Sequence, residues 1–546
     1  MNIMDHFSGW SQFAAGVVPV SGCWLIAKRY RKSGKTRGSA TWMTLWQAHR
    51  AGLLSAIGNK RSSGPGLVVG DWKRRLLLPV YYRGDGNILT VGAPGSMKGT
   101  GSLIPNALKW PFLFLSDPGG EITAVCIKAW RQRGYNVHII NPWGLYENEP
   151  HNLKSSGFNP LDVLDPLSDS FEDDALWLAK TMLPGGKNGN ATSEFFEGKA
   201  FGIYHALIIY NKTSEPPENQ HLVQVREYVR GTLEEWAILI GKMIKSPNNI
   251  VAETGRDLKL MMVVPKSLIG MIATMEVATK WLDSSRVRET VTRSGVRFAD
   301  LKGRGEDGEK LKGAVFSCII ALQYKDSHAA LARLAIACTL IIAQRGEMEK
   351  DRPRMLVMID EFASLKRIDM VVAALNTLRR YRVWFHLAVQ TLGQIKDIYD
   401  EEGLSQVEIG CELRQYFASW DKLTSEHVSA ACGTATVSEA VSGKDPNIVG
   451  RQLAFREEVT QIRRDEQIVF FGNLPPAKMK IRPYWQRPEL RGTFYDNPYH
   501  GKTLGLQITW PLQWIAGRAV RSVAGFKGPL VIISLLMAAA LIGGLQ

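Results

Sequence analysis

Cysteine and histidine are few and scattered in this sequence, and their distribution excludes several kinds of site. The six cysteines among 546 residues include no CxxC pair and no metal-ligand spacing, so the sequence predicts neither a disulfide framework nor a zinc module. The ten histidines form no zinc-like cluster, so we expect no transition-metal site. Internal repeats and low-complexity tracts are lacking as well. This cysteine usage is typical of proteins in a reducing cytosol.

Acidic residues are outnumbered by basic ones. The chain has 52 Asp and Glu against 67 Lys and Arg, which gives a formal net charge of +15. On a large protein this charge favours a polyanionic partner, either nucleic acid or an acidic membrane surface. The 45% hydrophobic content is enough for well-formed cores. The length leaves room for about two to four domains.

Long apolar runs occur only near the two ends of the chain. Residues 7–27 carry no charge and precede several basic residues, as expected of a membrane segment whose basic flank stays in the cytoplasm. Pro, Gly and Ser within this run leave an interfacial or re-entrant segment as the alternative. Residues 529–545 are more uniformly apolar and just long enough to span a bilayer, with a partner-docking helix as the alternative. A cleavable signal peptide fits poorly, because the basic residues follow the first run.

A glycine-rich loop after a β-like run is the strongest functional pattern. Residues 89–105 have the sequence LTVGAPGSMKGTGSLIP, which approximates the P-loop pattern GxxxxGK followed by Ser or Thr. In a P-loop, backbone N–H groups and a helix N-terminus surround the phosphates while the lysine adds a charge. An ordinary glycine-rich turn between a strand and a helix is the alternative. The expected nucleotide-binding residues are Gly92, Ala93, Pro94, Gly95, Ser96, Met97, Lys98, Gly99, Thr100 and Gly101.

Two positions depart from the P-loop pattern. Met97 replaces the last glycine, and Gly99 stands where a Mg²⁺-binding hydroxyl is expected, with Thr100 one place later. If the loop needs a positive φ at Met97, a residue other than glycine costs on the order of 1 kcal/mol. We therefore expect this position to affect the rate of hydrolysis more than the binding of nucleotide.

A second element about 260 residues downstream supports the phosphate site. Residues 355–359, MLVMI, are consecutively apolar and predict a strand buried on both faces. Asp360 and Glu361 follow directly, at the edge where α/β sheets bind ligands. This is a Walker-B pattern, in which Asp360 would hold Mg²⁺ and Glu361 would activate the attacking water. A solvated loop after a core strand is the alternative.

The rest of the chain alternates short apolar runs with helical patterns, which predicts a doubly wound α/β domain. Between about residues 168 and 304 the helical pattern dominates, and we expect an all-α domain inserted into the nucleotide-binding one. The expected helices lie at residues 173–182, 194–210, 222–245 and 258–281. The expected strands lie at residues 76–81, 88–91, 112–115, 137–140, 314–320, 355–359 and 384–389.

Several short segments follow one another in a specific order. They are GSATW at 38–42, GLL at 52–54, IPN at 104–106, DPGGE at 117–121, FNPL at 158–161, residues 281–301, DEF at 360–362, VQT at 389–391, DKLT at 421–424 and CGTATV at 432–437. In this order the segments resemble the coupling-protein family of type IV secretion systems, the TraG-like ATPases of conjugative DNA transfer. The likeness covers residues 38–487. Two features depart from the family pattern. Gly119 stands where the family favours lysine, and the chain has one N-terminal membrane candidate where the family has two.

The resemblance implies a RecA-like ATPase that uses ATP and Mg²⁺ and assembles as a ring of six copies. It also implies an anchor in the bacterial inner membrane, with the catalytic part in the cytoplasm. Its implied partners are single-stranded DNA bound without sequence preference, a relaxase or a secreted effector protein, and inner-membrane components of the secretion channel. Gln390 would sense the γ-phosphate. Arg379 would act on the site of a neighbouring subunit, although Arg379 and Arg380 could instead be an ordinary surface pair.

The expected division of the chain is an N-terminal membrane-associated segment (1–40), a nucleotide-binding domain in two parts (41–167 and 305–490), the all-α insertion (168–304) and a C-terminal linker with a transmembrane tail (491–546). Two other functions stay open. One is a receptor platform that binds nucleotide with little or no hydrolysis and recruits effector proteins. The other is an FtsK-like DNA translocase, which fits less well because no winged-helix domain has room after residue 491.

Overall fold

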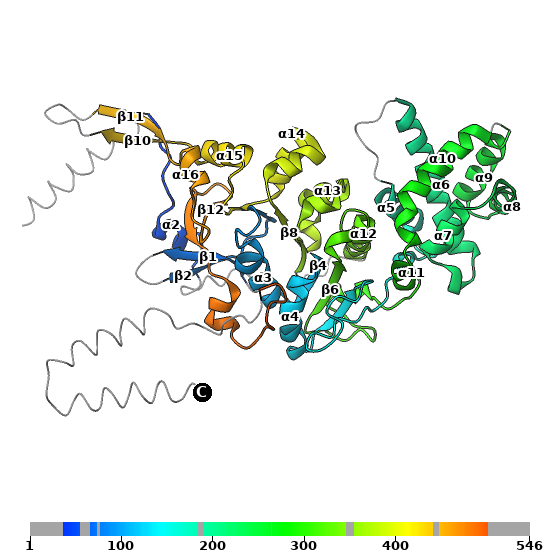
Figure 1. Cartoon of the computed structure of the whole chain (residues 1–546), viewed down its shortest axis with the longest axis horizontal. Coiled ribbons are helices and arrows are strands. Elements are labelled where there is room, and N and C mark those ends of the chain that lie inside the picture. Colours follow the sequence, from blue (N-terminus) through cyan, green and yellow to red (C-terminus); the bar gives the residue numbers. More distant parts are fainter. Residues whose placement is uncertain are drawn as a thin grey trace, which may run out of the picture.

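The structure is a computed structural model that describes residues 37–54, 66–73, 77–183, 191–263, 265–345, 354–439 and 447–500. Within these residues an 11-stranded sheet forms the centre of the molecule, and a lobe of helices lies at one end of it (Figure 1). Strands β10 and β11 form a separate two-stranded sheet. The strands are β1 (Leu67–Lys73), β2 (Leu77–Tyr82), β3 (Ile88–Val91), β4 (Phe112–Pro118), β5 (Asn136–Ile140), β6 (Ala314–Ile320), β7 (Met355–Ile359), β8 (Val383–Val389), β9 (Leu413–Tyr416), β10 (Thr434–Glu439), β11 (Asn447–Gln452), β12 (Glu466–Phe471) and β13 (Ala477–Lys480).

The large sheet is mixed. Its strand order is β2-β1-β13-β12-β9-β3-β8-β7-β4-β6-β5. All neighbours from β9 to β5 pair in parallel, whereas β12, β13, β1 and β2 extend the sheet with antiparallel pairs. The carboxyl ends of β3, β7 and β8 therefore meet at one edge, which is where α/β proteins bind their ligands.

Helices cover both faces of the parallel strands. The helices are α2 (Leu45–Arg50), α3 (Ile104–Lys109), α4 (Glu121–Gln132), α5 (Phe171–Met182), α6 (Ala191–Ser214), α7 (Leu222–Val229), α8 (Leu233–Ile244), α9 (Asn249–Met261), α10 (Pro265–Thr279), α11 (Ser285–Val291), α12 (Ala329–Gln344), α13 (Asp369–Thr377), α14 (Leu392–Gly410), α15 (Lys422–Cys432) and α16 (Arg456–Thr460). Phe112 and Phe114 of β4 pack into one core with α12 and α13, while Leu113 and Leu115 pack into the other with α3 and α4. This two-sided burial explains the continuous apolar runs of the strands.

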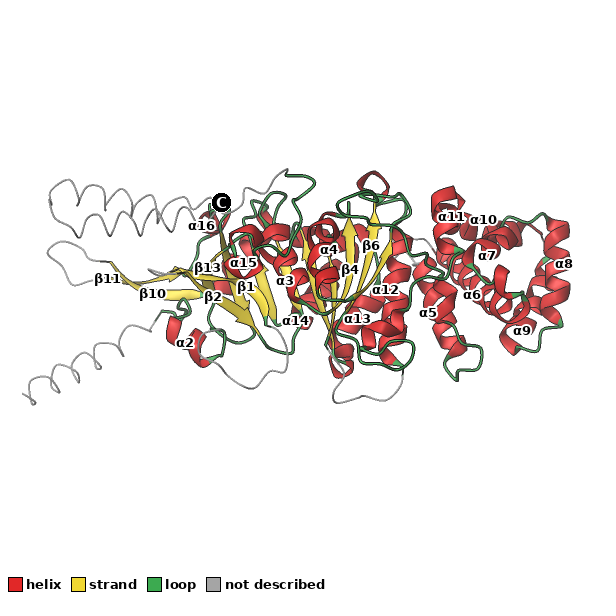
Figure 2. Ribbon diagram, turned by 90° about the horizontal axis from the view of Figure 1, so that it is seen from below, coloured by secondary structure: helices red, strands yellow, loops and turns green. Residues whose placement is uncertain are grey.

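Between β5 and β6 the named elements of the described residues are all helices, joined by loops. Helices α6 to α11 form the lobe beyond the sheet, and α5 connects it to α12 (Figure 2). The expectation of one helix over residues 222–245 is wrong, because α7 ends before Gly231 and Thr232 caps a new helix by accepting a hydrogen bond from Glu235 N. The single helix expected over 258–281 is also divided, since Pro265 begins α10.

The strands expected at residues 88–91, 314–320 and 355–359 are confirmed residue for residue, and the other four agree within a few residues. Strands β1, β9, β10, β11, β12 and β13 were not expected from the sequence. In β9, for example, Arg414 and Gln415 interrupt the apolar pattern, and only tertiary contacts compensate for burying Gln415.

Within the described part of the chain, no helix is both long and apolar enough to cross a bilayer. The two expected membrane segments, residues 7–27 and 529–545, lie outside the described residues.

Candidate nucleotide-binding site

The glycine-rich loop connects β3 to a helix at the carboxyl edge of the sheet. Gly92 must be glycine, because a Cβ there would lie 2.6 Å from Ser96 Oγ. Met97 has φ 71°, so the loop does require a left-handed backbone at the position where the P-loop pattern has glycine. The following residues, Gly99–Leu103, form a π-helical turn that leads into α3. Such turns shift the register of the residues that follow, which fits the displacement of the hydroxyl from Gly99 to Thr100.

Lys98 turns back over its own loop. Its Nζ donates a 2.7 Å hydrogen bond to Gly92 O. Burial lowers the pKa of the Lys98 ammonium, and the Glu361 and Asp360 carboxylates nearby oppose that shift. The expected phosphate-binding lysine and the two expected carboxylates therefore lie within electrostatic reach of each other.

Asp360 directly follows β7 and is partly buried. Its backbone N–H bonds to Ser116 O of β4 at 3.1 Å. Burial of the carboxyl group, followed by the Asp117 carboxylate, raises the pKa of Asp360. Asp117 is itself buried and caps α4, accepting bonds from Thr123 Oγ1 at 2.6 Å and from Thr123 N at 2.7 Å. Burial raises the pKa of Asp117 to about 7. A bound cation would favour the ionised form of these carboxyl groups.

Glu361 and Gln390 contact each other across the ends of β7 and β8. Gln390 Nε2 donates to Glu361 Oε2 at 2.6 Å, and Gln390 N is held by Gln394 Oε1 at 2.9 Å. Glu361 has φ 72°, a left-handed conformation that is uncommon for a non-glycine residue. Strained backbone of this kind is concentrated at functional sites.

Buried polar atoms without partners identify what the site can hold. Ser96 Oγ, Thr100 Oγ1 and Glu361 Oε1 are buried and make no hydrogen bond within the described residues. Leaving such an atom unsatisfied costs about 1–3 kcal/mol. The loop therefore fits a ligand that offers hydrogen-bond acceptors to the hydroxyls and a cation to the carboxylate. A phosphate chain with Mg²⁺ meets this description. Thr100 and Asp360 supply the oxygen ligands that Mg²⁺ prefers.

A buried polar network supports the loop from beneath. Thr90 Oγ1 lies 2.9 Å from His386 Nε2 and donates to Gln415 Oε1 at 3.1 Å, and Ser102 Oγ donates to the same oxygen at 3.1 Å. Gln415 Nε2 donates in turn to Val69 O. Burial lowers the pKa of His386 to about 3, so the ring stays neutral. The network joins β3, β8 and β9 to the π-helical turn; its members are isolated polar residues in apolar strands, and the sequence alone did not reveal it.

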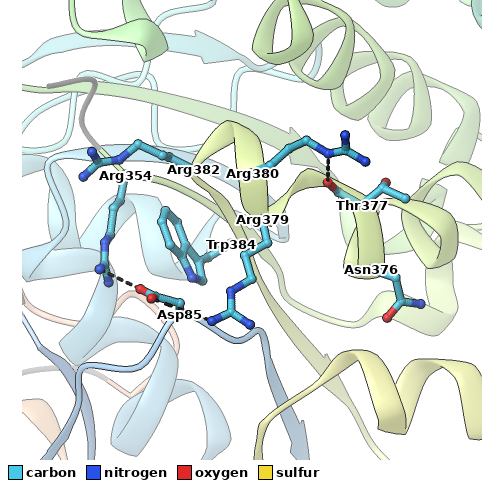
Figure 3. A pocket seen from close by; sticks show the side chains of 8 residues that line it. All are labelled: Asp85, Arg354, Asn376, Thr377, Arg379, Arg380, Arg382 and Trp384. Carbon is cyan, nitrogen blue, oxygen red and sulfur yellow. Dashed lines mark hydrogen bonds and ion pairs between the residues drawn. The ribbon is translucent and has the colours of Figure 1, made fainter. Parts of the chain in front are cut away.

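Arg379 is not at this edge. It precedes the amino end of β8, whereas Gln390 follows the carboxyl end, a separation of roughly 20 Å at about 3.3 Å per residue. Its side chain is 62% exposed and lies 3.7 Å from Asp85. Figure 3 shows Arg379 in a cavity of about 650 Å³ lined also by Arg354, Arg380 and Arg382. Within one chain Arg379 cannot reach the glycine-rich loop.

Comparison with known proteins identifies the family of this chain. The family model described as "Type IV secretory system Conjugative DNA transfer" matches residues 42–503. The chain belongs to this family.

Relatives of the chain carry matching names. "Conjugal transfer protein TraG" of Agrobacterium fabrum (strain C58 / ATCC 33970) is 24% identical over 437 residues, which cover 76% of this chain and 63% of that protein. "Type IV secretion system-coupling protein VirD4" of Bartonella quintana (strain Toulouse) is 24% identical over 510 residues, which cover 89% of this chain and 73% of that protein. The chain thus spans less than two thirds of the length of this TraG relative.

Solved structures share the fold. The "Bacterial conjugative coupling protein TrwBdeltaN70" superposes with a TM-score of 0.59 at 15% identity, covering 82% of this chain and 94% of that one. "Plasmid coupling protein TrwB in complex with the non-hydrolisable ATP-analogue ADPNP" gives a TM-score of 0.60 at 14% identity, with 82% and 95% covered. The chain is a mixed α/β protein with a large parallel sheet of this RecA-like type.

Proposed function

We propose that this protein is an ATPase that couples a DNA or protein substrate to a type IV secretion channel and drives its transfer by ATP hydrolysis. The contact between Gln390 and Glu361, at the same edge as Lys98, is the observation that carries the proposal. It joins a candidate base and a candidate phosphate sensor on neighbouring strands. TrwB, which has the same fold, is described in complex with ADP and Mg²⁺ and with an ATP analogue.

Each residue at the carboxyl edge has a role in this proposal. Lys98 releases Gly92 O and binds the β- and γ-phosphates together with the loop amides from Gly92 to Gly101. Thr100 and Asp360 hold Mg²⁺, which neutralises charge on the phosphate oxygens when bound. Glu361 orients the attacking water and accepts its proton. Gln390, bonded to Glu361, registers whether the γ-phosphate is present.

Arg379 completes the site only in an assembly. Because it lies at the opposite edge of its own sheet, it serves the nucleotide of an adjacent copy in a ring, where a guanidinium stabilises charge on the transferred phosphoryl group. A ring of six copies, anchored to the inner membrane by the terminal segments, accords with the family. Residues 41–167 and 305–490 form the motor in this proposal, and residues 168–304 the all-α insertion.

The substrate follows from charge and family membership. A net charge of +15 suits sequence-independent contact with the backbone of a single strand, which a relaxase or an effector protein would accompany. The left-handed Met97 is the feature that favours the rival function, a receptor platform with little hydrolysis. Turnover of ATP by the detergent-solubilised full chain, with and without single-stranded DNA, separates the two: the motor requires DNA-stimulated turnover that Lys98→Ala abolishes.

A further inference from the structure

The cavity around Arg379 is strongly basic. Among the lining residues that the structure describes are four arginines and one carboxylate, that of Asp85, around a volume of about 650 Å³. The aromatic ring in the lining, Trp384, is only 5% exposed and is already covered by Arg354, so it offers no face for stacking a base. The cavity is thus suited to phosphate.

Arg354 is the fixed member of this group. Its guanidinium carbon lies 4.6 Å from the centre of the Trp384 ring, and its Nη1 donates to Gly84 O at 3.3 Å. The side chain is 16% exposed. A guanidinium stacked on an aromatic ring and bonded to a backbone oxygen has little freedom to move.

Asp85 contacts both Arg354 and Arg379. Its Oδ1 accepts a 2.7 Å hydrogen bond from Arg354 Nη2, while its Oδ2 lies 3.7 Å from Arg379 Nη2 (Figure 3). One carboxylate therefore connects a fixed guanidinium to a 62% exposed one. Because both side chains are largely exposed, the pair is weak, and a phosphate with two or more charges can take Arg379 from Asp85 without first breaking a strong bond.

We propose that Asp85, held by Arg354 on Trp384, is the positioning residue for Arg379 and presents that guanidinium to the phosphates of a nucleotide bound by a second copy of this chain. The proposal rests on the proposed function, because it needs ATP hydrolysis with Arg379 acting between copies. It adds that the acting arginine is oriented by a chain of contacts from Trp384 through Arg354 and Asp85. Without these contacts, the long Arg379 side chain would have to be ordered at each turnover.

A double-mutant cycle tests this. Steady-state turnover of the full chain in detergent, at protein concentrations that support assembly, is measured for Asp85→Asn, Arg379→Ala and the double variant. We expect Asp85→Asn to lower kcat about threefold, in keeping with a weak exposed pair, with KM for ATP unchanged, and to cause no further loss when Arg379 is already alanine. Asp85→Glu should restore part of the loss, and a purely structural role of Asp85 would not produce this dependence on Arg379.

Two further variants keep the test independent of folding. Arg354→Lys keeps the charge but loses the planar fork, and should lower kcat in the same way as Asp85→Asn. The matched control is Asp465→Asn, since Asp465 is 40% exposed and also bridges two basic residues, Arg463 and Lys480. It should turn over ATP like the wild type.

The outcomes separate two kinds of failure. Wild-type kcat in Asp85→Asn alongside a slow Arg379→Ala, or losses that simply multiply in the double variant, would overturn the positioning role and leave the proposed function intact. Wild-type turnover in Arg379→Ala would overturn both the positioning role and the action of Arg379 between copies. Turnover unaffected by Lys98→Ala would instead contradict the ATPase itself.

Discussion

Gln390 Nε2 donates a 2.6 Å hydrogen bond to Glu361 Oε2, across the carboxyl ends of β8 and β7. The bond fixes the direction of a carboxylate whose second oxygen, Oε1, is buried and makes no hydrogen bond in the part of the chain that the structure describes. A candidate base is thus oriented before any substrate binds, with one oxygen committed to the sensor and the other available to a water molecule. Because the two residues have different roles in the proposed function, mutating each one separately should have different effects.

Glu361→Gln should abolish turnover while nucleotide still binds. The amide cannot accept a proton, and loss of a general base typically costs 10²- to 10⁴-fold in rate, about 3–5 kcal/mol. Binding of a fluorescent ATP analogue, measured by anisotropy, should change by less than about threefold, because the amide is neutral and equal in size. Glu458→Gln, on the surface helix α16, is the control. Full turnover in Glu361→Gln would remove Glu361 from the mechanism.

Met97→Gly should stabilise the nucleotide-free protein slightly and leave turnover nearly unchanged. Met97 already has φ 71°, so glycine removes a backbone strain of on the order of 1 kcal/mol without altering the path of the loop. Urea denaturation checks the stability, and a coupled ATPase assay checks the rate. Turnover that occurs only in Met97→Gly would favour the receptor platform over the motor.

Thr100→Ala should weaken the dependence of nucleotide binding on Mg²⁺. Thr100 Oγ1 is buried without a partner within the described residues, and it stands one place beyond the position where a P-loop carries its metal-binding hydroxyl. Titrating Mg²⁺ into protein with the fluorescent ATP analogue should show a concentration midpoint raised by about tenfold or more. The control is Thr460→Ala, which removes a hydroxyl that donates to Glu457 O on α16 and should behave as the wild type does. An unchanged midpoint in Thr100→Ala would exclude this hydroxyl as a metal ligand.

His386→Gln should make stability less sensitive to acid. Burial lowers the pKa of His386 to about 3, whereas the ring titrates near 6.5 in an unfolded chain. Between these values the unfolded state binds a proton that the folded state does not. The wild type therefore loses stability as pH falls from about 6.5 towards 3, by up to about 1.4 kcal/mol per pH unit from this residue. Denaturation at a series of pH values should show a shallower slope in His386→Gln, and an equal slope would mean that the buried ring contributes nothing.

The parallel half of the fold was predictable from sequence because its strands are buried on both faces. Residues 355–359 form a continuous apolar run and residues 88–91 are apolar except for Thr90, and the two carboxylates and the glycine-rich loop directly follow them. The antiparallel extension was not predictable in the same way. Gln415 and Gln467 are polar yet buried within β9 and β12, where the amide of Gln415 donates a 3.0 Å hydrogen bond to Gln467 that no local pattern reveals.

In the candidate site, too, some residues could be predicted from the sequence and others could not. Lys98, Asp360 and Glu361 follow strands in the sequence, so their convergence at one edge could be expected from parallel topology alone. The influence of Asp117 on Asp360 depends on β4 and β7 being neighbours in space, although some 240 residues separate them in the chain. The partner of Arg379 was equally inaccessible, because Asp85 lies far from it in sequence and belongs to a loop with no recognisable pattern.

The most direct test of the account is ATP turnover by the full chain in detergent, with and without single-stranded DNA, compared between the wild type and Lys98→Ala. The account predicts turnover in the wild type that rises when DNA is added and is lost in Lys98→Ala under both conditions. Wild-type protein that binds nucleotide but hydrolyses it no faster than Lys98→Ala, even with DNA present, would contradict it.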